Sequence, residues 1–249
     1  MQNKLRLDML IVQRGITRTR EQAQALIMTG RVSCNGIMID KAGTRVSHDV
    51  KLNIDALPTY VSRGGDKLAY ALLVFNVQIQ GCVCLDVGAS TGGFTDCLLQ
   101  NQASKVYAVD VGYGQLAQRI RDDKRVVVIE RVNAHFPFVL PGIVDIATVD
   151  VSFISLTKVL PNVAKHLSPG GYIVALVKPQ FEAMRSDVGR RGIIRDPKIH
   201  SSTLGKVINW AVDYGLRVRN ITASPILGGS GNREFLLLLQ RPYSSWQIP

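Results

Sequence analysis

Apolar residues follow a helical spacing at the start of the chain and then alternate in two short runs. Two helices are predicted, over residues 6–13 and 19–28, because the apolar side chains of each fall on one face. The dipeptide Asn35-Gly36 separates the two later runs and is typical of a tight turn between antiparallel strands. Residues 1–57 are therefore predicted to form a small α+β domain, too small to be an enzyme by itself.

Residues 58–65 carry turn and extended signals without an amphipathic period, and they are predicted to be an interdomain linker. A second domain is predicted over residues 66–249. It opens at Asp66 with a helix whose apolar side chains follow the i, i+3, i+4, i+7 spacing, namely Leu68, Ala71, Leu72 and Phe75.

Apolar and amphipathic runs alternate through this second domain, which predicts an α/β fold with a mostly parallel, doubly wound sheet. Only Ser224–Arg233 separate the last two apolar runs, too few residues for a crossover helix. These strands are therefore predicted to pair as an antiparallel hairpin, with the final strand at the edge of the sheet. Strands are predicted near 82–85, 105–110, 125–129, 144–150, 171–178, 217–223 and 234–240, and helices near 94–100, 114–122, 156–167 and 199–215.

The first strand of this domain runs directly into a glycine-rich turn, D-V-G-A-S-T-G-G-F at 86–94. Strand, turn and helix start together predict a Rossmann-like site for an adenosine-bearing cofactor. The spacing fits neither G-x-G-x-x-G nor a P-loop, so pyrophosphate is not the expected ligand. Asp86, placed before the glycines, suits a cofactor with a cationic, amino-acid-like head, of which S-adenosylmethionine is the common example. The alternative is a tight strand-to-helix turn without a ligand.

Further candidate contacts to the cofactor follow the next two strands. Asp110 comes 22 positions after Gly88, where a carboxylate can accept hydrogen bonds from both ribose hydroxyls. Val111 is expected beside the adenine and Asn133 at its amino group, although an ordinary polar loop residue fits Asn133 equally well. The complete predicted set is Asp86, Gly88, Ala89, Ser90, Thr91, Gly92, Gly93, Phe94, Asp110, Val111 and Asn133.

The charge of the chain points to a partner. Its 249 residues include 30 Lys and Arg against 19 Asp and Glu, a net charge of +11. This excess predicts a polyanionic partner, foremost nucleic acid. Every apolar run is shorter than the ~20 residues that span a bilayer, and no signal-peptide pattern is present, so a cytoplasmic protein is expected. The four cysteines form no C-x-x-C pair and lack neighbouring histidines, so no metal site is predicted.

Four charged residues fall at or near the ends of predicted strands and at a helix start: Asp150, Lys178, Glu234 and Lys67. Each alone could be merely solvated, but together two bases and two acids could converge at the catalytic edge of the sheet. The stretch Asp150–Phe153, D-V-S-F, lacks the prolines typical of amino-group methyltransferases. No cysteine follows a proline, as cytosine-carbon methylation would need. Of the three reactions considered, methylation of a hydroxyl group is therefore the one that these residues favour.

The amino-terminal domain resembles a known RNA-binding module. Its order of R-L-D-x-L, two helices, G-R-V and N-G is similar to the module first known from small-subunit ribosomal protein S4. The resemblance implies that arginines of this domain contact RNA phosphates, although any one of them could instead belong to a solvated basic face. One departure is T-R-T-R at 17–20, where Ser-Arg is expected. The candidate residues are Arg6, Arg18, Arg20 and Arg31.

Longer motifs resemble the TlyA (hemolysin A) family of ribosomal RNA 2′-O-methyltransferases, which are related to the FtsJ type. The resemblance implies that Lys67, Asp150, Lys178 and Glu234 form a catalytic Lys-Asp-Lys-Glu tetrad. It also implies a ribose 2′-hydroxyl, typically of cytidine in ribosomal RNA, as the target. The motifs are V-S-R-G-G-x-K-L at 61–68, D-V-G-A-S-T-G-G-F-T-D at 86–96, D-V-S-F-I-S-L at 150–156, V-K-P-Q-F-E at 177–182 and G-N-R-E-F at 231–235.

Lys178 is the candidate base that takes the proton of the hydroxyl. Lys67 would supply a second positive charge that favours the neutral amine, whereas Asp150 and Glu234 would oppose that effect. The sequence leaves open which effect prevails.

Residues 181–197 form a basic, glycine-containing segment that follows Lys178. This segment is predicted to clamp substrate RNA, and a solvated lid is the alternative. The candidate RNA contacts outside the first domain are Arg63, Arg185, Arg190 and Arg191.

Two competing hypotheses come from other classes of protein. The hemolysin name suggests a membrane-lytic protein, which no apolar run in the sequence supports. A non-catalytic, ribosome-binding assembly factor with a vestigial cofactor site is the other. The intact glycine turn and the four charged residues argue against it.

Overall fold

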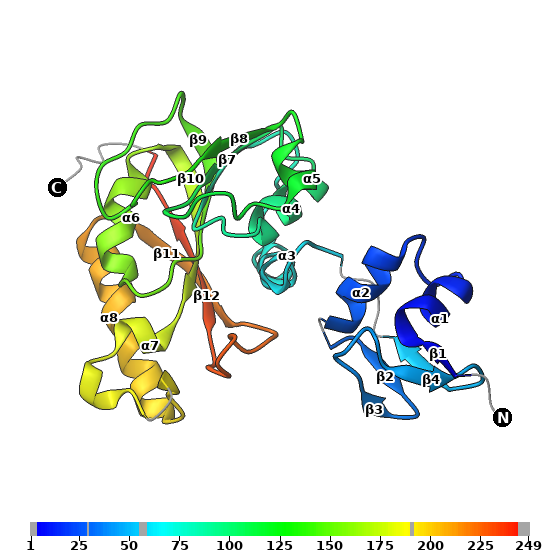
Figure 1. Cartoon of the computed structure of the whole chain (residues 1–249). Coiled ribbons are helices and arrows are strands. Elements are labelled where there is room, and N and C mark those ends of the chain that lie inside the picture. The colour runs from blue at the N-terminus through cyan, green and yellow to red at the C-terminus, as the bar shows by residue number, and fades with distance from the viewer. Residues whose placement is uncertain (1–3, 29, 55–58, 190–191, 244–249) are drawn as a thin grey trace. The chain divides into compact units, whose positions relative to one another are not determined.

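The computed structural model describes residues 4–28, 30–54, 59–189 and 192–243. The chain divides into two compact units, Met1–Pro58 and Thr59–Pro249 (Figure 1).

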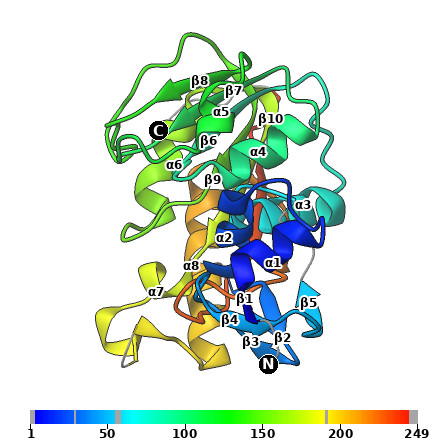
Figure 2. The same cartoon turned by 45° about the vertical axis from the view of Figure 1, so that its right-hand side comes forward.

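The first unit contains two helices and two small antiparallel sheets. Helices α1 (Leu7–Gln13) and α2 (Arg20–Met28) lie side by side and match the two predicted helices (Figure 2). The predicted hairpin is present, with Asn35 (φ +50°) and Gly36 (φ +83°) at its turn. Its strands are β2 (Val32–Cys34) and β3 (Ile37–Met38); β5 (Leu52–Ile54) pairs with β2, and β1 (Lys4–Arg6) pairs with β4 (Arg45–Ser47).

The buried carboxylate of Asp8 ties helix α1 to helix α2. It accepts hydrogen bonds from Arg6 Nε (3.0 Å) and Nη2 (2.9 Å), from Arg20 Nε (2.9 Å) and from Gln24 Nε2 (3.0 Å). The hydrogen-bonded Arg6 guanidinium is the largest cause that holds the pKa of Asp8 well below its usual range. Arg6 and Arg20, two candidate RNA contacts, therefore share one buried acceptor, and their side chains stay 41% and 48% exposed.

The second unit is built on a seven-stranded sheet with the order β11-β12-β10-β9-β6-β7-β8. Strands β6 to β10 run parallel, as predicted, and β12 is antiparallel to both of its neighbours. The strands are β6 (Val83–Val87), β7 (Lys105–Val109), β8 (Val126–Ile129), β9 (Val144–Val149), β10 (Leu167–Val177), β11 (Arg217–Ala223) and β12 (Phe235–Gln240).

The prediction that the final strand lies at the edge of the sheet is wrong. Strand β12 pairs with β10 on one side and with β11 on the other, so β11 forms the edge. The residues of the two strands explain this order. Strand β12 is almost continuously apolar, as a strand covered on both faces requires, whereas β11 exposes Arg217 and Arg219.

Helices cover both faces of this sheet (Figure 1). Helices α6 (Leu156–Ala164) and α8 (Pro197–Asp213) pack on one face. Helices α3 (Arg63–Phe75), α4 (Gly93–Gln100) and α5 (Gln118–Arg121) pack on the other. The helix predicted over 114–122 is reduced to the four residues of α5, since Gly114 adopts φ +69° at its start. A short helix, α7 (Pro179–Glu182), follows β10 and was not predicted.

Helix α3 begins at Arg63, so the last three residues of the predicted linker 58–65 are helical. Its glycines are packing residues as well as turn signals. A Cβ at Gly65 would overlap the Tyr60 ring, and one at Gly64 would lie 3.3 Å from the ring of Phe94. The apolar stripe predicted on this helix is buried in the core.

Replacing Asp8 with Ala is expected to destabilise the first unit by about 2 kcal/mol, since a hydrogen bond to a charged group contributes roughly 1.5–3 kcal/mol and the half-exposed arginines regain water. Because the pKa of Asp8 is lowered by folding, its contribution is fully present above the unfolded-state pKa of about 4 and is lost as the pH falls below it. Amide hydrogen exchange of α1 and α2 in the whole chain measures both effects. The exposed Asp40→Ala variant is the control, and equal exchange in both variants at pH 7 would contradict the expectation.

Candidate active site

The glycine turn between β6 and α4 lies pressed against the end of β9 and the start of α3. Gly88 (φ +84°) and Gly92 (φ +95°) adopt the left-handed conformation that favours glycine. A Cβ at Gly88 would overlap the carbonyl oxygen of Asp150, and a Cβ at Gly93 would overlap the hydroxyl of Ser62. The turn therefore needs glycine at the points where it touches both neighbours.

Two aspartates hold the segments on either side of this turn through hydrogen bonds. Asp86 is fully buried and accepts hydrogen bonds from the hydroxyls of Thr95 (2.7 Å) and Thr148 (3.0 Å). Burial raises the pKa of Asp86 to about 6, and the two threonine donors oppose this shift. Asp110 accepts the backbone N–H groups of Ser90 (2.7 Å) and Gly112 (2.6 Å). Asp86 thus connects β6 to α4 and β9, and its side chain lines neither of the two cavities that border the turn.

A cavity of about 260 Å³ opens between the glycine turn and the start of α3. Residues 88–91 with Gly93 and Phe94 form one wall of it, and residues 62–64 with Lys67 form the other. Asp150 lies at the same cavity. The structure therefore brings most of the glycine-turn candidates and two of the four charged residues to one space.

The four charged residues form two ion pairs. Nζ of Lys67 lies 2.5 Å from Oε2 of Glu234, and these side chains are only 10% and 4% exposed. Nζ of Lys178 lies 2.6 Å from Oδ1 of Asp150, with side chains 12% and 23% exposed. The second contact is an ion pair without the alignment of a hydrogen bond, and the Lys178 ammonium donates its hydrogen bond to Oγ of Ser152 (2.9 Å).

The local backbone explains how Glu234 reaches Lys67. Glu234 directly precedes β12, and a Cβ at Gly228 would overlap its carboxylate. The loop between β11 and β12 thus leaves room for the side chain by placing a glycine opposite it. Lys67 lies in the second turn of α3, at the end of the helix that borders the cavity.

Other predicted cofactor contacts lie outside this cavity. A narrow gap of about 10 Å³ on the far side of Ser90 is lined by Asp110, Gly112 and Glu130 among others. Val111 is 69% exposed, and Oδ1 of Asn133 accepts the backbone N–H of His135 (3.0 Å). Neither side chain lines the cavity or the gap.

Phe153 was not among the residues predicted for the site. Its side chain is 90% exposed and its backbone adopts φ +63°, a conformation rare for a bulky residue. Its ring centroid lies 5.0 Å from that of Phe181. An exposed aromatic ring three residues after Asp150 suits stacking on an unpaired base. The signal was the aromatic residue of D-V-S-F, at the place where amino-group methyltransferases carry one.

The candidate RNA contacts are distributed over both units. Arg63 lines the cavity beside Lys67, and Arg185 is exposed in a short 3₁₀ turn, Arg185–Asp187. In the first unit Arg18 is exposed and Arg31 is half-buried. Arg190 and Arg191 lie outside the described residues.

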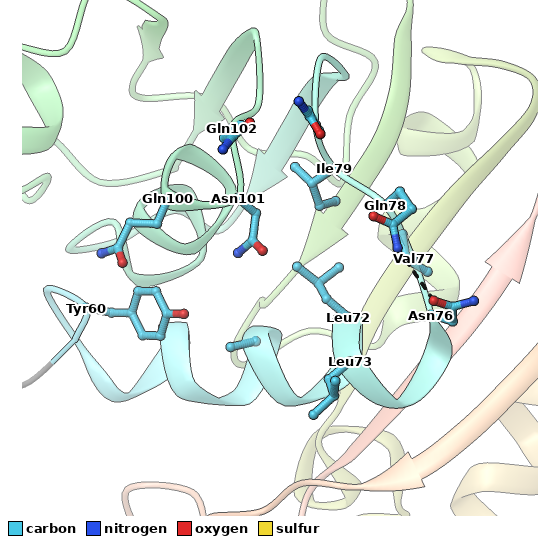
Figure 3. Close-up of a pocket in the computed structure, with 12 residues that line it drawn as sticks. Tyr60, Leu72, Leu73, Asn76, Val77, Gln78, Ile79, Gln100, Asn101 and Gln102 are labelled. Atoms are coloured by element: carbon cyan, nitrogen blue, oxygen red, sulfur yellow. Dashed lines mark hydrogen bonds between the residues drawn. The ribbon is translucent and has the colours of Figure 1, made fainter.

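A separate cavity of about 420 Å³ lies at the carboxyl ends of α3 and α4 (Figure 3). Carboxamide side chains surround it, among them Asn76, Gln78, Gln100 and Gln102. None of the predicted catalytic or cofactor residues lines it. The cavity at the glycine turn, lined by Lys67 and Asp150, is therefore the candidate active site.

Sequence comparison identifies both units. The profile of the FtsJ-like methyltransferase family matches residues 60–241. The chain belongs to this family. The profile of the S4 domain matches residues 5–51, which confirms the resemblance of the first unit to that module.

Relatives of known name resemble the whole chain. The 16S/23S rRNA (cytidine-2′-O)-methyltransferase TlyA of Mycobacterium tuberculosis is 43% identical over 244 residues, which cover 96% of this chain and 91% of the relative. Hemolysin A of Brachyspira hyodysenteriae is 42% identical over 238 residues, with coverages of 93% and 98%. A solved structure of a hemolysin-named protein from Streptococcus thermophilus has a TM-score of 0.75 and 46% identity, covering 98% of this chain and 90% of its own. The predicted membership of the TlyA family is thus confirmed.

No helix in the described part of the chain is both long and apolar enough to cross a membrane.

Replacing Glu234 with Ala is expected to cost about 3–5 kcal/mol of folding stability, because the nearly buried Lys67 ammonium then has no carboxylate partner. The double variant Lys67→Met with Glu234→Leu fills the same space with apolar groups and is expected to recover most of that loss. Urea denaturation of the three proteins measures the difference. A single variant as stable as the parent protein would show that Lys67 finds another partner or water.

Proposed function

We propose that this protein transfers the methyl group of S-adenosylmethionine to a ribose 2′-hydroxyl of ribosomal RNA, with cytidine as the target nucleoside. The observation that carries the proposal is the pair of lysine–carboxylate contacts beside the glycine turn, with Lys67 and Asp150 lining one cavity. Membership of the FtsJ-like family and the name of the Mycobacterium tuberculosis relative support the same reaction and the same substrate class. The reaction then takes place in the cytoplasm, where ribosomal subunits are.

The residues around the glycine turn fit this cofactor. Gly88 and Gly92 adopt left-handed conformations and pack against the Asp150 carbonyl and the Leu116 side chain, so only glycine allows the tight turn that borders the cavity. Gly88, Ser90 and Gly92 would hold the methionine end. Asp110 would hold the ribose, since each of its oxygens now accepts one backbone N–H and keeps a second lone pair. When bound, S-adenosylmethionine supplies an electrophilic methyl group on a sulfonium centre.

The chain's own residues then serve the hydroxyl group. A ribose hydroxyl is a poor nucleophile at neutral pH, so its proton must pass to a positioned base as the oxygen attacks. We assign this role to Lys178, because Asp150 and Ser152 hold its Nζ at the end of β10. Its ammonium must first release a proton to solvent, and the neutral amine then accepts the proton of the hydroxyl. Lys67, fixed by Glu234 at the opposite wall of the cavity, orients the hydroxyl.

Recognition of the RNA is divided between the two units in this proposal. The S4 domain supplies basic contacts to phosphates, and the net charge of +11 favours the polyanion. Arg63 at the cavity and Arg185 beyond α7 add positive charge on the second unit. The exposed ring of Phe153 is available to stack on an unpaired base of the RNA. The intact tetrad favours this enzymatic role over a non-catalytic assembly factor.

Incubation with S-adenosylmethionine labelled in its methyl group and with ribosomal subunits that lack native methylation tests the proposal. Digestion to nucleosides and mass spectrometry are expected to place the label on ribose, as 2′-O-methylcytidine. Label on a base would contradict the assignment of the tetrad. A lack of label on both subunits, with cofactor binding confirmed by calorimetry, would contradict the proposed substrate.

Replacing Lys178 with Ala is expected to lower the rate of methyl transfer about 10²–10⁴-fold, the usual contribution of a general base. The affinity for S-adenosylmethionine, measured by calorimetry, is expected to stay near that of the parent protein, because Lys178 does not line the cavity at the glycine turn. Lys165→Ala, which removes an exposed lysine after α6, is the matched control. Retained turnover in the Lys178 variant would remove this residue from the role of base.

A further inference from the structure

The Lys178–Asp150 pair is carried by two separate loops, and their spacing decides whether the two side chains meet. Asp150 and Ser152 belong to the loop between β9 and α6. Lys178 directly follows β10 and is the N-cap residue of α7. The two strands are neighbours in the sheet and pair with each other as far as Ala175 and Val149, while β10 continues to pair with β12 as far as Val177. The sheet thus fixes the first residue of each loop, and direct contacts between the loops fix the rest.

Glu182, the last residue of α7, connects these loops through buried hydrogen bonds. It is only 3% exposed. One carboxylate oxygen accepts the hydroxyl of Ser155 (2.6 Å), and the other accepts the backbone N–H of Leu156 (2.7 Å). Nζ of Lys206, in α8, donates to the backbone oxygen of Glu182 (3.0 Å). A carboxylate at the start of α6 is also favoured by the partial positive charge of a helix N-terminus.

The other contacts between the loops are weaker or more exposed. Oδ1 of Asp150 has an ion pair but no aligned hydrogen bond within the described residues. The ring contact between Phe153 and Phe181 lies at a side chain that is 90% exposed. Water competes with exposed contacts far more than with a buried, charged hydrogen bond. The Lys178 ammonium also donates to Oγ of Ser152 (2.9 Å), but Ser152 is exposed. Glu182 is thus the most deeply buried connection between the loops within the described residues.

We propose that Glu182 is a positioning residue, which latches the start of α6 to α7 and so holds Lys178 against Asp150. It touches neither the cavity at the glycine turn nor the reacting groups, and it acts through the loops. Burial raises the pKa of its carboxyl, while Ser155 and Leu156 stabilise the ionised form. This role deepens the proposed methyl transfer and rests on it.

Steady-state methyl transfer to ribosomal subunits by three variants tests the latch. Glu182→Ala is expected to lower kcat about 10–100-fold, since a misplacement of about 1 Å can cost about 10²-fold in rate. The KM values for S-adenosylmethionine and for the subunits are expected to stay unchanged. Glu182→Gln is expected to restore kcat to within a few-fold, because its amide oxygen can accept from Leu156 and its amide nitrogen can donate to Ser155.

Gln240→Leu is the matched control. Gln240 is 4% exposed and donates a buried hydrogen bond to the Gly170 oxygen (2.9 Å), at the end of β12 remote from Glu234. The variant loses a buried polar contact of the same sheet without touching the loops, and its kcat is expected to be unchanged.

Full kcat in a folded Glu182→Ala variant would overturn the proposal. An equal loss of kcat in Glu182→Ala and Glu182→Gln would also overturn it, since the charge of Glu182 and not its hydrogen bonds would then matter. A change in KM without a change in kcat would overturn it as well.

A second readout separates this inference from the proposed function. Amide hydrogen exchange of residues 150–158 and 178–183 is expected to be faster in Glu182→Ala than in the parent protein, and unchanged in Gln240→Leu. This comparison requires no activity. If the parent protein transfers no methyl group to ribose, the proposed function fails, whereas the exchange rates still decide whether Glu182 holds the loops. Equal exchange in the parent protein and Glu182→Ala would overturn the latch.

Discussion

The ion pair between Lys67 and Glu234 is the interaction on which the rest of the site depends. Its members are 167 positions apart in the sequence and almost fully buried, so neither charge can be left without the other. The pair fixes the start of α3 against the start of β12. Since α3 forms one wall of the cavity at the glycine turn and Lys67 lines that wall, the shape of the cavity depends on this ion pair.

Much of the fold could be predicted from the sequence, because its patterns are local. Helices α1 and α2, the Asn35-Gly36 hairpin and the parallel strands appear where the apolar spacing placed them. The errors concern features that depend on packing between distant segments. The place of β12 inside the sheet depends on which strands pair with it. The start of α3 at Arg63 depends on the packing of Tyr60 and Phe94 against Gly65 and Gly64. Glycine signals a turn in the sequence whether it makes a turn or a close contact.

The candidate site shows the same division. The motifs named the four charged residues, and strand ends of a parallel sheet explain why they could converge. The motifs did not say which lysine pairs with which carboxylate, since that depends on the position of each segment in space. Asp86 was expected to face the ligand, but two threonines from α4 and β9 enclose it. Glu182, Ser155 and Leu156 all fall within the motifs at 177–182 and 150–156, but the motifs did not show that these residues meet, because they are remote from one another in the chain.

The antiparallel direction of β12 has a consequence for synthesis on the ribosome. Because this strand runs against its neighbours, its first residue, and not its last, lies at the edge where the parallel strands end. Glu234 therefore reaches that edge only after all the other strands of the sheet have been made. Until then the ammonium group of Lys67 in α3 lacks the Glu234 carboxylate, and this wall of the cavity lacks the contact that fixes it. The ion pair that fixes this wall of the cavity therefore joins the first helix of the second unit to its last strand, and it forms only after the segments between them have been synthesised.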